Sequence, residues 1–350
     1  MNSIEIHLTE YGGRGYFAKE NIQKGSVILR CDHPFASTVF RRFRKEVCAY
    51  CFAYQGGKTL KFRLPKQVYG KEKGGAYAGL YFCSQECVDQ WVFFEDADGS
   101  LSDTLQLVDS AVRSTQTVAD KESEVFHGDV PLTRELIDEK WRLKIEELSR
   151  TSDLKVQNLP HIDEIEHDIA RLVVVTLVKK FRVLSQDGAK LSTAQTEWDE
   201  FSSLQSNEYF QIIAYHPYMA AYLRTFEFLY KVLPPKFKNV FTASILRDTV
   251  GIEAGNAFGI WELPLNLESE CFGTSIRPLA SYFNHQCEPT VKKERNGRSM
   301  IFTTVQDIPA GQELYICYGM MEDMSFEERS KILSDQWHFK CNCKKCELKR

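Results

Sequence analysis

The chain has 350 residues and a formal net charge of −4, and 43% of its residues are hydrophobic, 12% aromatic and 26% charged. These fractions are typical of a folded protein with two or three domains, and they exclude a chain dominated by disorder. The net charge gives no general reason to expect nucleic-acid binding, which would need a local basic patch.

The first twenty residues, MNSIEIHLTEYGGRGYFAKE, contain no apolar stretch of the kind that forms a secretion signal. The longest apolar run, residues 172–178, is too short to cross a bilayer. We therefore expect a soluble protein of the nucleus, the cytoplasm or both, without membrane contact.

Cysteine usage is the most informative part of the composition. Eleven cysteines in a chain without a secretion signal are more typical of metal binding or burial than of disulfides. Eight of them fall into spaced groups, and the other three are predicted to be small buried residues: Cys31, Cys271 and Cys317.

The first group joins a CxxC pair to a CxxxC pair across a loop, and it comprises Cys48, Cys51, Cys83 and Cys87. Structural zinc takes four thiolates in a tetrahedron, and short spacers let one turn present two ligands to the same ion. The sequence therefore predicts a zinc site, the alternative being two unrelated buried pairs. The intervening loop is locally basic through Lys58, Lys61, Arg63, Lys66, Lys71 and Lys73. A solvated loop is favoured there over a contact with an acidic partner or nucleic acid within residues 58–73.

Helices are predicted within residues 85–115 and 132–250, where stretches such as LIDEKWRLKIEEL and EIEHDIARLVVVTLVKKFRVL repeat apolar residues every three or four positions. Residues 109–130 are more polar and are predicted to form a mobile connection. Residues 300–305 are predicted to form a strand, followed by a turn over 307–311. The combination indicates an α+β fold.

The last cysteine group is odd in number. Cys341, Cys343 and Cys346 supply three thiolates, and a structural zinc needs a fourth ligand. Cys287, in the stretch SYFNHQCEPT, is the candidate. A nucleophile at Cys287 would need a base within reach, and His285 is near in sequence without necessarily facing it. We favour the ligand, and thus two zinc sites in the chain.

Several motifs, in the right order, resemble those of SET-domain methyltransferases. NHQCEP at 284–289 resembles their NHxCxP motif, and GQELYICYG at 311–319 resembles GxELxxxYG. The tail at 337–346 resembles the zinc-binding post-SET segment, while GRG at 13–15 and the residues at 22–28 resemble the GxG motif and first hairpin. The resemblance implies a β core with threaded C-terminal motifs, in which NHQCEP and GQELYICYG lie on neighbouring segments.

CSQEC at 83–87 also resembles the MYND finger, and a SET domain interrupted by such a finger and a helical insert is the arrangement of the SMYD subfamily. The implied domains are the N-terminal part of SET at 1–45, a single-zinc finger at 46–92, a helical insert at 93–250, core SET at 251–324 and the post-SET segment at 325–350. The finger lacks half of the usual MYND ligands, and no C-terminal helical-repeat domain is expected. Three further positions depart from the subfamily pattern: Gln286, Thr290 and Trp337, the last standing where a tyrosine helps to shape the lysine channel.

The resemblance implies an S-adenosylmethionine-dependent protein-lysine methyltransferase in which the Tyr318 hydroxyl holds the amine. The glycine turn is implied to contact the methionine part of the cofactor, Asn284 its amino-acid or adenine groups, and His285 the adenine through its backbone. Asn256 is implied at the amino-acid end, Phe339 in a stack on adenine, and His161 as a match to a histidine of the insert. The implied cofactor residues are Gly12, Gly13, Arg14, Gly15, His161, Asn256, Asn284, His285, Tyr318 and Phe339.

Two alternatives stay open. A degenerate finger and altered SET positions also fit a scaffold with little turnover, which S-adenosylmethionine affinity would distinguish from an enzyme. Methylation of a small molecule or of a target other than lysine is the other. Histone and non-histone proteins are equally compatible as substrates, and the oligomeric state is open. Because Cys287 neighbours the implied cofactor contacts, we expect zinc loss there to weaken cofactor binding.

Overall fold

The computed structural model describes residues 3–11, 13–65, 77–115, 132–150, 159–185, 189–321 and 323–349. The chain packs as two units, and both are built from segments distant in sequence. Unit 1 comprises residues 1–35, 266–268 and 277–350, and unit 2 comprises residues 36–265 and 269–276. The domain boundaries derived from the sequence stay a prediction, because packing units divide a chain on a different criterion.

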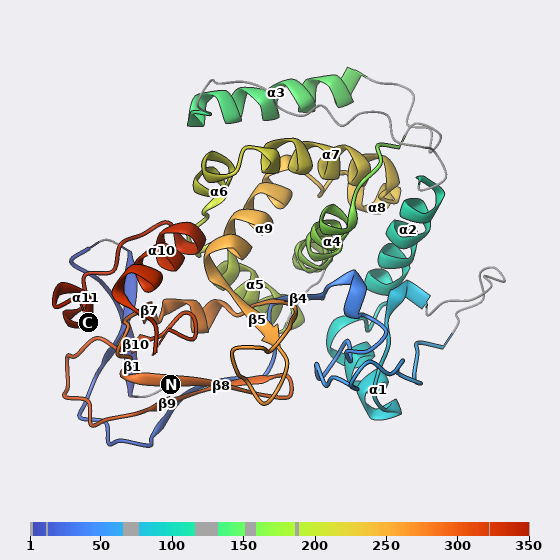
Figure 1. The fold of residues 1–350 in the computed structure, drawn as a ribbon. Coiled ribbons are helices and arrows are strands. Elements are labelled where there is room, and N and C mark those ends of the chain that lie inside the picture. The colour runs from blue at the N-terminus through green and yellow to red at the C-terminus, as the bar shows by residue number, and fades with distance from the viewer. Residues whose placement is uncertain are drawn as a thin grey trace. The chain divides into compact units, whose positions relative to one another are not determined.

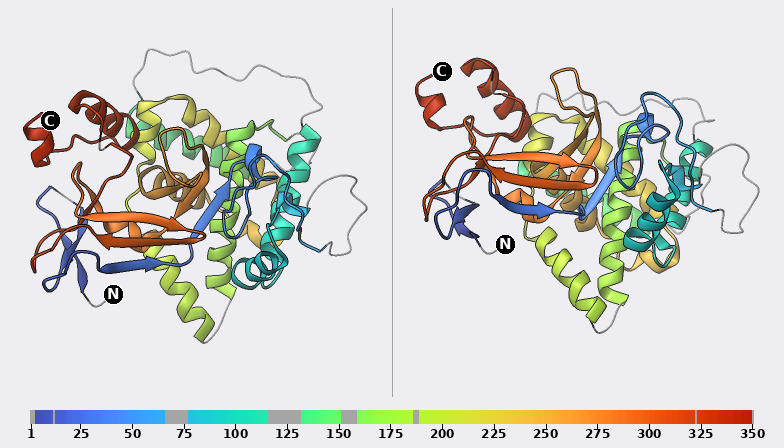
Figure 2. Two further views of the ribbon diagram at one scale, coloured as in Figure 1. Left: turned by 60° about the horizontal axis from the view of Figure 1, so that its bottom comes forward. Right: turned by 90° about the horizontal axis from the view of Figure 1, so that it is seen from below.

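Unit 1 is made mainly of short strands. It contains β1 (Ile4–Leu8), β2 (Arg14–Ala18), β3 (Val27–Cys31), β7 (Asn284–His285), β8 (Val291–Asn296), β9 (Ser299–Thr304) and β10 (Tyr315–Ile316), with the 3-10 turn η4 (Pro278–Tyr282) and the helices α10 (Phe326–Trp337) and α11 (Lys344–Glu347). β1 and β2 form an antiparallel hairpin. β9 lies between β3 and β8, and Figure 2 shows β3 running beside the β8–β9 hairpin.

β9 is the central strand of its sheet, and its sequence explains its place. In SMIFTT, the side chains of Met300, Phe302 and Thr304 are buried and alternate with half-buried ones, as expected for a strand with one face on the core. β8 is charged, and its burial falls off after Val291, which suits an edge strand. The predicted strand at 300–305 is thus confirmed, and so is the turn after it, where Gly311 adopts a φ of 79°.

The pairing of β7 with β10 brings two predicted motifs together. The strands are parallel, with Asn284 opposite Tyr315 and His285 opposite Ile316. The Gln286 N–H donates to the Ile316 carbonyl at 3.0 Å. The expectation that the two motifs lie on neighbouring segments is therefore confirmed, and the backbone ladder between them fixes their register.

Unit 2 is largely helical. Its helices are α1 (Gln85–Glu95), α2 (Ser100–Thr115), α3 (Arg134–Arg150), α4 (Glu164–Ser185), α5 (Ala189–Ser202), α6 (Glu208–Ala214), α7 (Pro217–Val232), α8 (Pro235–Lys238) and α9 (Ala243–Asn256). A sheet of β4 (Ala36–Val39), β6 (Cys271–Ile276) and β5 (Ala257–Trp261) completes it, with β6 in the middle and two 3-10 turns, η1 (Arg41–Phe43) and η2 (Tyr77–Gly79). The helices predicted within residues 85–115 and 132–250 are confirmed, and the bounds of the insert stay a prediction. The polar connection predicted at 109–130 is wrong for residues 109–115, which end α2, and its remainder lies outside the described residues.

α4 is the central helix of unit 2 (Figure 1), and the run 172–178 lies within it. Every side chain of that run is buried, which is what an all-round apolar helix requires in a globular protein. Among the described helices, none combines the length and apolar character needed to cross a membrane.

The flanks of the first cysteine group are joined to α4 by buried ion pairs. Arg44, which precedes the group, pairs with Asp168 of α4. Asp109 of α2, which follows the group, accepts from Arg171 and contacts His167 Nε2, each at 2.8 Å. Because buried charges are stable only when paired, this network fixes both flanks to one helix.

Candidate active site and metal centres

The predicted fourth ligand does meet the tail cysteines. The sulfurs of Cys287, Cys341, Cys343 and Cys346 all lie within 4.8 Å of one another, and none is in a disulfide. Cys287 Sγ is 3.5 Å from Cys346 Sγ and 4.0 Å from Cys341 Sγ. Four sulfurs bound tetrahedrally at the usual zinc–sulfur length would lie about 3.8 Å apart. The arrangement therefore fits one zinc ion.

The groups around this cluster also fit a metal bound by four thiolates. Such a centre carries a net charge of −2, whereas four thiols carry none. Arg329 of α10 is 0% exposed, and although burial lowers its pKa, hydrogen bonds and charge interactions with Cys287 and Cys346 together raise the pKa above its usual value. A cation buried against sulfurs needs an anionic partner, which the metal-bound thiolates would provide.

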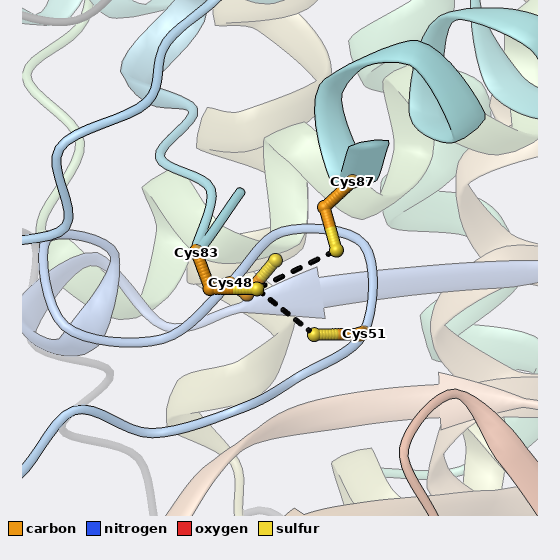
Figure 3. A group of neighbouring side chains, drawn as sticks. All are labelled: Cys48, Cys51, Cys83 and Cys87. Atoms are coloured by element: carbon orange, nitrogen blue, oxygen red, sulfur yellow. Dashed lines mark hydrogen bonds between the residues drawn. The ribbon is translucent and has the colours of Figure 1, made fainter. Parts of the chain in front are cut away.

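The first cysteine group is also assembled. The sulfurs of Cys48, Cys51, Cys83 and Cys87 lie within 4.8 Å of one another and point to a common centre (Figure 3). Cys83 Sγ is 3.5 Å from both Cys51 Sγ and Cys87 Sγ. Ser84 caps α1 by accepting from the Cys87 N–H at 3.1 Å. The cap that starts this helix therefore also fixes the backbone of Cys87, one of the four candidate ligands. Both predicted four-cysteine groups thus exist and fit zinc.

The basic loop between the two cysteine pairs is only partly described. Lys58, Lys61 and Arg63 are exposed, and the Arg63 guanidinium lies 5.2 Å from the centre of the Tyr81 ring. Lys66, Lys71 and Lys73 lie outside the described residues. The predicted acidic or nucleic-acid partner of this loop stays a prediction.

Tyr318, the predicted catalytic residue, is held by its backbone. Its N–H donates to His285 Nδ1 at 3.2 Å, and its carbonyl accepts from Lys293 Nζ at 2.8 Å. The ring packs beside Trp337 and Phe339, with centroids 5.5 Å and 6.2 Å away. Burial, and secondly the charge of Glu313, raise the pKa of Tyr318, so its hydroxyl stays protonated. Within the described part of the chain the hydroxyl forms no hydrogen bond, which leaves it available to a ligand.

Asn284 lies on β7 with its amide oriented by two acceptors. Its Nδ2 donates to the Arg14 carbonyl at 3.1 Å and to Glu313 Oε1 at 2.8 Å. Both amide hydrogens are thereby used, and an amide oxygen only accepts. The group that Asn284 offers a ligand is therefore Oδ1, which suits an ammonium. For the predicted contact of Asn284 with the amino-acid or adenine groups of the cofactor, only this acceptor remains.

Glu313 also holds two tyrosines. Its Oε2 accepts from Tyr11 Oη at 2.6 Å and from Tyr315 Oη at 2.7 Å. Burial raises the pKa of Tyr315 to about 12, so it remains a donor at neutral pH. The sequence motif contained Glu313 but gave it no role. Its place beside Asn284 depends on β7 and β10 being paired, which no local pattern states.

The glycine turn is placed next to Asn284. Gly13 adopts a φ of 83°, which favours glycine, and the space where a Cβ would stand is open. At Gly15 a Cβ would lie 2.5 Å from Glu313 Oε1 and 2.8 Å from Asn284 Nδ2. A side chain at position 15 would therefore displace Glu313 and Asn284. The structure explains Gly15 by these two neighbours, and not by direct contact of the backbone with a ligand. Arg14 is exposed, and its guanidinium lies 4.9 Å from the centre of the Tyr282 ring. Gly12 lies outside the described residues.

Two departures from the subfamily pattern are accommodated. The Thr290 N–H donates to the Tyr315 carbonyl at 3.1 Å, and its Oγ1 accepts from the Tyr315 N–H at 2.9 Å. Thr290 therefore continues the β10 ladder on the far side from β7. Trp337, the last residue of α10, packs its ring beside Tyr318. Unlike the tyrosine of the subfamily pattern, it brings no hydroxyl to this position. His338 ends α10 in the left-handed conformation. The next residue, Phe339, packs against His285, with the two ring centroids 5.9 Å apart.

Two predicted cofactor residues lie in unit 2. The Asn256 amide donates to the carbonyls of Gln205 and Ile252 at 2.9 Å and 3.0 Å. These bonds connect the last residue of α9 to the preceding turn of that helix and to Gln205. His161 is exposed just before α4. Their contacts with a cofactor stay predictions.

Sequence reasoning missed two basic residues of the site, Lys293 and Arg329. Their roles depend on contacts with a backbone carbonyl and with sulfurs that are remote in sequence. No local pattern signals such partners, since lysine and arginine on an amphipathic strand or helix are ordinarily solvated.

Comparisons with known proteins identify the family that the chain resembles. Residues 13–319 match the family described as SET domain. A potential protein lysine methyltransferase of Saccharomyces cerevisiae, SET6, is 28% identical over 98% of this chain and 95% of its own length. The human histone-lysine N-methyltransferase SMYD3 is 40% identical over 82 residues, which cover 23% of this chain and 19% of SMYD3. A crystal structure of the SET domain of LSMT bound to lysine and AdoHcy aligns with 97% of this chain and 53% of that chain, at 13% identity and a TM-score of 0.34.

Proposed function

Because the chain belongs to the SET-domain family, we propose that it is an S-adenosylmethionine-dependent methyltransferase that modifies lysine side chains of a protein substrate. The yeast relative that spans nearly the whole chain is named a potential protein lysine methyltransferase. The observation that carries the proposal is the state of Tyr318. Its backbone N–H and carbonyl are both hydrogen-bonded, and its hydroxyl is protonated and forms no hydrogen bond with the described residues.

The residues around the predicted cofactor position fit the group. S-adenosylmethionine, when bound, supplies a methyl group on a cationic sulfur that is a good leaving group. Asn284 Oδ1 would accept from its ammonium group, and the open turn at Gly13 allows its close approach. Phe339 and the His285 ring offer an aromatic surface beside Tyr318.

Tyr318 acts on the acceptor amine by hydrogen bonding and not as a base. A phenol whose pKa is raised by burial does not release its proton at neutral pH. The lysine amine, with an ordinary pKa of about 10.4, must lose its own proton before transfer. A bound cofactor and substrate that exclude water from the space beside the Trp337 and Phe339 rings would favour the neutral amine. The role of this chain is therefore to align a neutral amine.

The finer assignment to the SMYD type is part of the proposal. It is supported by the four-cysteine finger placed inside the SET sequence, by the helical insert after it, and by the stretch similar to SMYD3. The single-zinc finger and Trp337 distinguish this chain from the subfamily pattern.

Tyr318→Phe tests the proposal. Removing one oriented hydroxyl should lower turnover about 100-fold and leave the dissociation constant for S-adenosylmethionine within about threefold. Turnover is measured by mass spectrometry of a proteome incubated with the purified chain and isotopically labelled cofactor. A wild-type chain that binds no S-adenosylmethionine would end the enzyme proposal in favour of a scaffold.

A further inference from the structure

His285 lies between the tail cysteine cluster and Tyr318. Its Nε2 is 3.4 Å from Cys287 Sγ, and its Nδ1 accepts from the Tyr318 N–H at 3.2 Å. The side chain is 8% exposed. One imidazole thus contacts a predicted metal ligand with one nitrogen and the predicted catalytic residue with the other.

The direction of the two hydrogen bonds follows from the chemistry of the ring. A backbone N–H only donates, so His285 Nδ1 is an acceptor and carries no proton. The proton of the neutral ring is then on Nε2, which donates to Cys287 Sγ. A metal-bound thiolate accepts this bond better than a thiol, because charge-assisted hydrogen bonds are about twice as strong as neutral ones.

The other anchor of Tyr318 does not involve the metal cluster. Lys293 of β8 donates to the Tyr318 carbonyl. The Tyr318 carbonyl is therefore held by a side chain of β8, and its N–H by a side chain that contacts Cys287. Of these two hydrogen bonds, only the one from the Tyr318 N–H to His285 is expected to change when the tail cluster gains or loses its metal.

We propose that His285 is a positioning residue through which metal binding at the tail cluster sets the orientation of Tyr318. With the metal bound, Cys287 is a fixed thiolate that keeps the imidazole in the orientation that accepts from Tyr318. Without it, Cys287 Sγ is no longer held in place, the imidazole loses the contact that orients its Nε2, and the hydrogen bond from the Tyr318 N–H to Nδ1 is weakened. The metal thus acts on the alignment of the acceptor amine, in addition to holding the tail. This inference rests on the proposed function for the role of Tyr318.

Two substitutions at His285 each keep one half of the connection. Glutamine places its amide nitrogen near the position of Nε2, so His285→Gln retains a donor to Cys287 and loses the acceptor for Tyr318. Asparagine places its amide oxygen near Nδ1, so His285→Asn retains the acceptor and loses the donor. Comparing the two separates the metal side of the imidazole from the tyrosine side.

The readouts require no methyl transfer. The first is the rate at which zinc passes from the tail cluster to a chelator, identified as the phase absent from Cys346→Ser. The second is the amide resonance of Tyr318 in protein labelled with ¹⁵N-tyrosine, identified as the signal missing from Tyr318→Phe. His285→Asn should release tail zinc about tenfold faster, since losing an outer partner of a metal ligand typically costs about 10- to 100-fold in affinity. His285→Gln should leave that rate within about threefold and shift the Tyr318 resonance.

Stripping zinc from the wild-type chain is the decisive measurement. The Tyr318 resonance should shift, and the same treatment of His285→Gln should produce no comparable shift. An unchanged wild-type resonance on zinc removal would overturn the proposal even if the variants fold poorly. Lys293→Met is the matched control, because it removes the other anchor of Tyr318 and should leave zinc release unchanged. If it accelerated zinc release as much as His285→Asn, general loosening would be the explanation and the proposal would be wrong. A chain that shows the coupling but transfers no methyl group would refute only the proposed function.

Discussion

The two four-cysteine groups of this protein have the same ligands and different surroundings. In the finger, all four cysteines lie within 40 residues, and the contacts around them are with the backbone and side chains of the finger itself, such as the bond from Cys87 N to Ser84 Oγ. In the tail, Cys287 stands 54 residues before Cys341. There the sulfurs contact His285, which touches Tyr318, and Arg329 of α10.

The separation of its ligands along the chain is expected to decide what a metal site influences. A cluster whose ligands are close in sequence mainly closes a loop that lacks a core of its own. A cluster whose ligands lie far apart in the sequence joins distant segments of the chain. The residues that contact its ligands then determine which parts of the protein respond to metal binding. We therefore expect loss of the finger metal to affect folding, and loss of the tail metal to affect chemistry as well.

Removing one ligand from each cluster should give the largest effects. Cys287→Ser should abolish tail zinc binding and lower both turnover and S-adenosylmethionine affinity by about 100-fold or more. Cys51→Ser should equally reduce the zinc content from two ions to one, but leave S-adenosylmethionine affinity within about threefold. Metal analysis and calorimetric titration with the cofactor check both variants. Equal losses of cofactor affinity would show that the two clusters are functionally equivalent.

An intermediate effect is expected from acid on the network that anchors the finger flanks. Burial, opposed by the Asp109 bond and assisted by the charges of Arg44 and Arg171, lowers the pKa of His167 to about 4. A histidine whose pKa is lowered from about 6.5 binds its proton in the unfolded chain first, so its stabilisation is present above pH 6.5 and is lost as the pH falls toward 4. From pH 7 to pH 5 this amounts to about 2 kcal/mol.

His167→Gln isolates that contribution. Denaturant titrations at the two pH values should show a smaller loss of unfolding free energy in the variant than in the wild type, by about 2 kcal/mol. The tail histidine His285, whose pKa burial also lowers to about 4, titrates in both proteins and cancels in the difference. An identical pH dependence of the two proteins would mean that the network does not hold His167 neutral.

The smallest effects should come from the serine caps beside the two clusters. Ser84 caps α1 in the finger, and Ser325 caps α10 in the tail, where it forms a reciprocal pair with Glu328. Alanine at either position should cost about 1 kcal/mol of unfolding free energy. Ser84→Ala should also speed zinc release from the finger, because Ser84 bonds to the N–H of a ligand residue. Ser325→Ala should leave both release rates unchanged, and a change in tail release would indicate that α10 supports that cluster more directly than its cap geometry suggests.

From the sequence alone follow the groups available for chemistry, including the eight cysteines that fit two metal sites and the tyrosine predicted to orient an amine. Spacing within CxxC, CxxxC and the tail triad is local information, and α4 and β9 carry periodic patterns that report burial directly. The odd number of tail cysteines even pointed to Cys287, because a tetrahedral ion needs four ligands.

Which of those groups contact one another depends on the folded chain. Asn284 became an acceptor only because Glu313 takes one of its amide hydrogens, and His285 became a link only because β7 and β10 run side by side. Arg329 and Lys293 found their partners across long sequence separations. A hydrogen bond depends on distance and direction between two groups, and for residues far apart in the chain only the fold determines either.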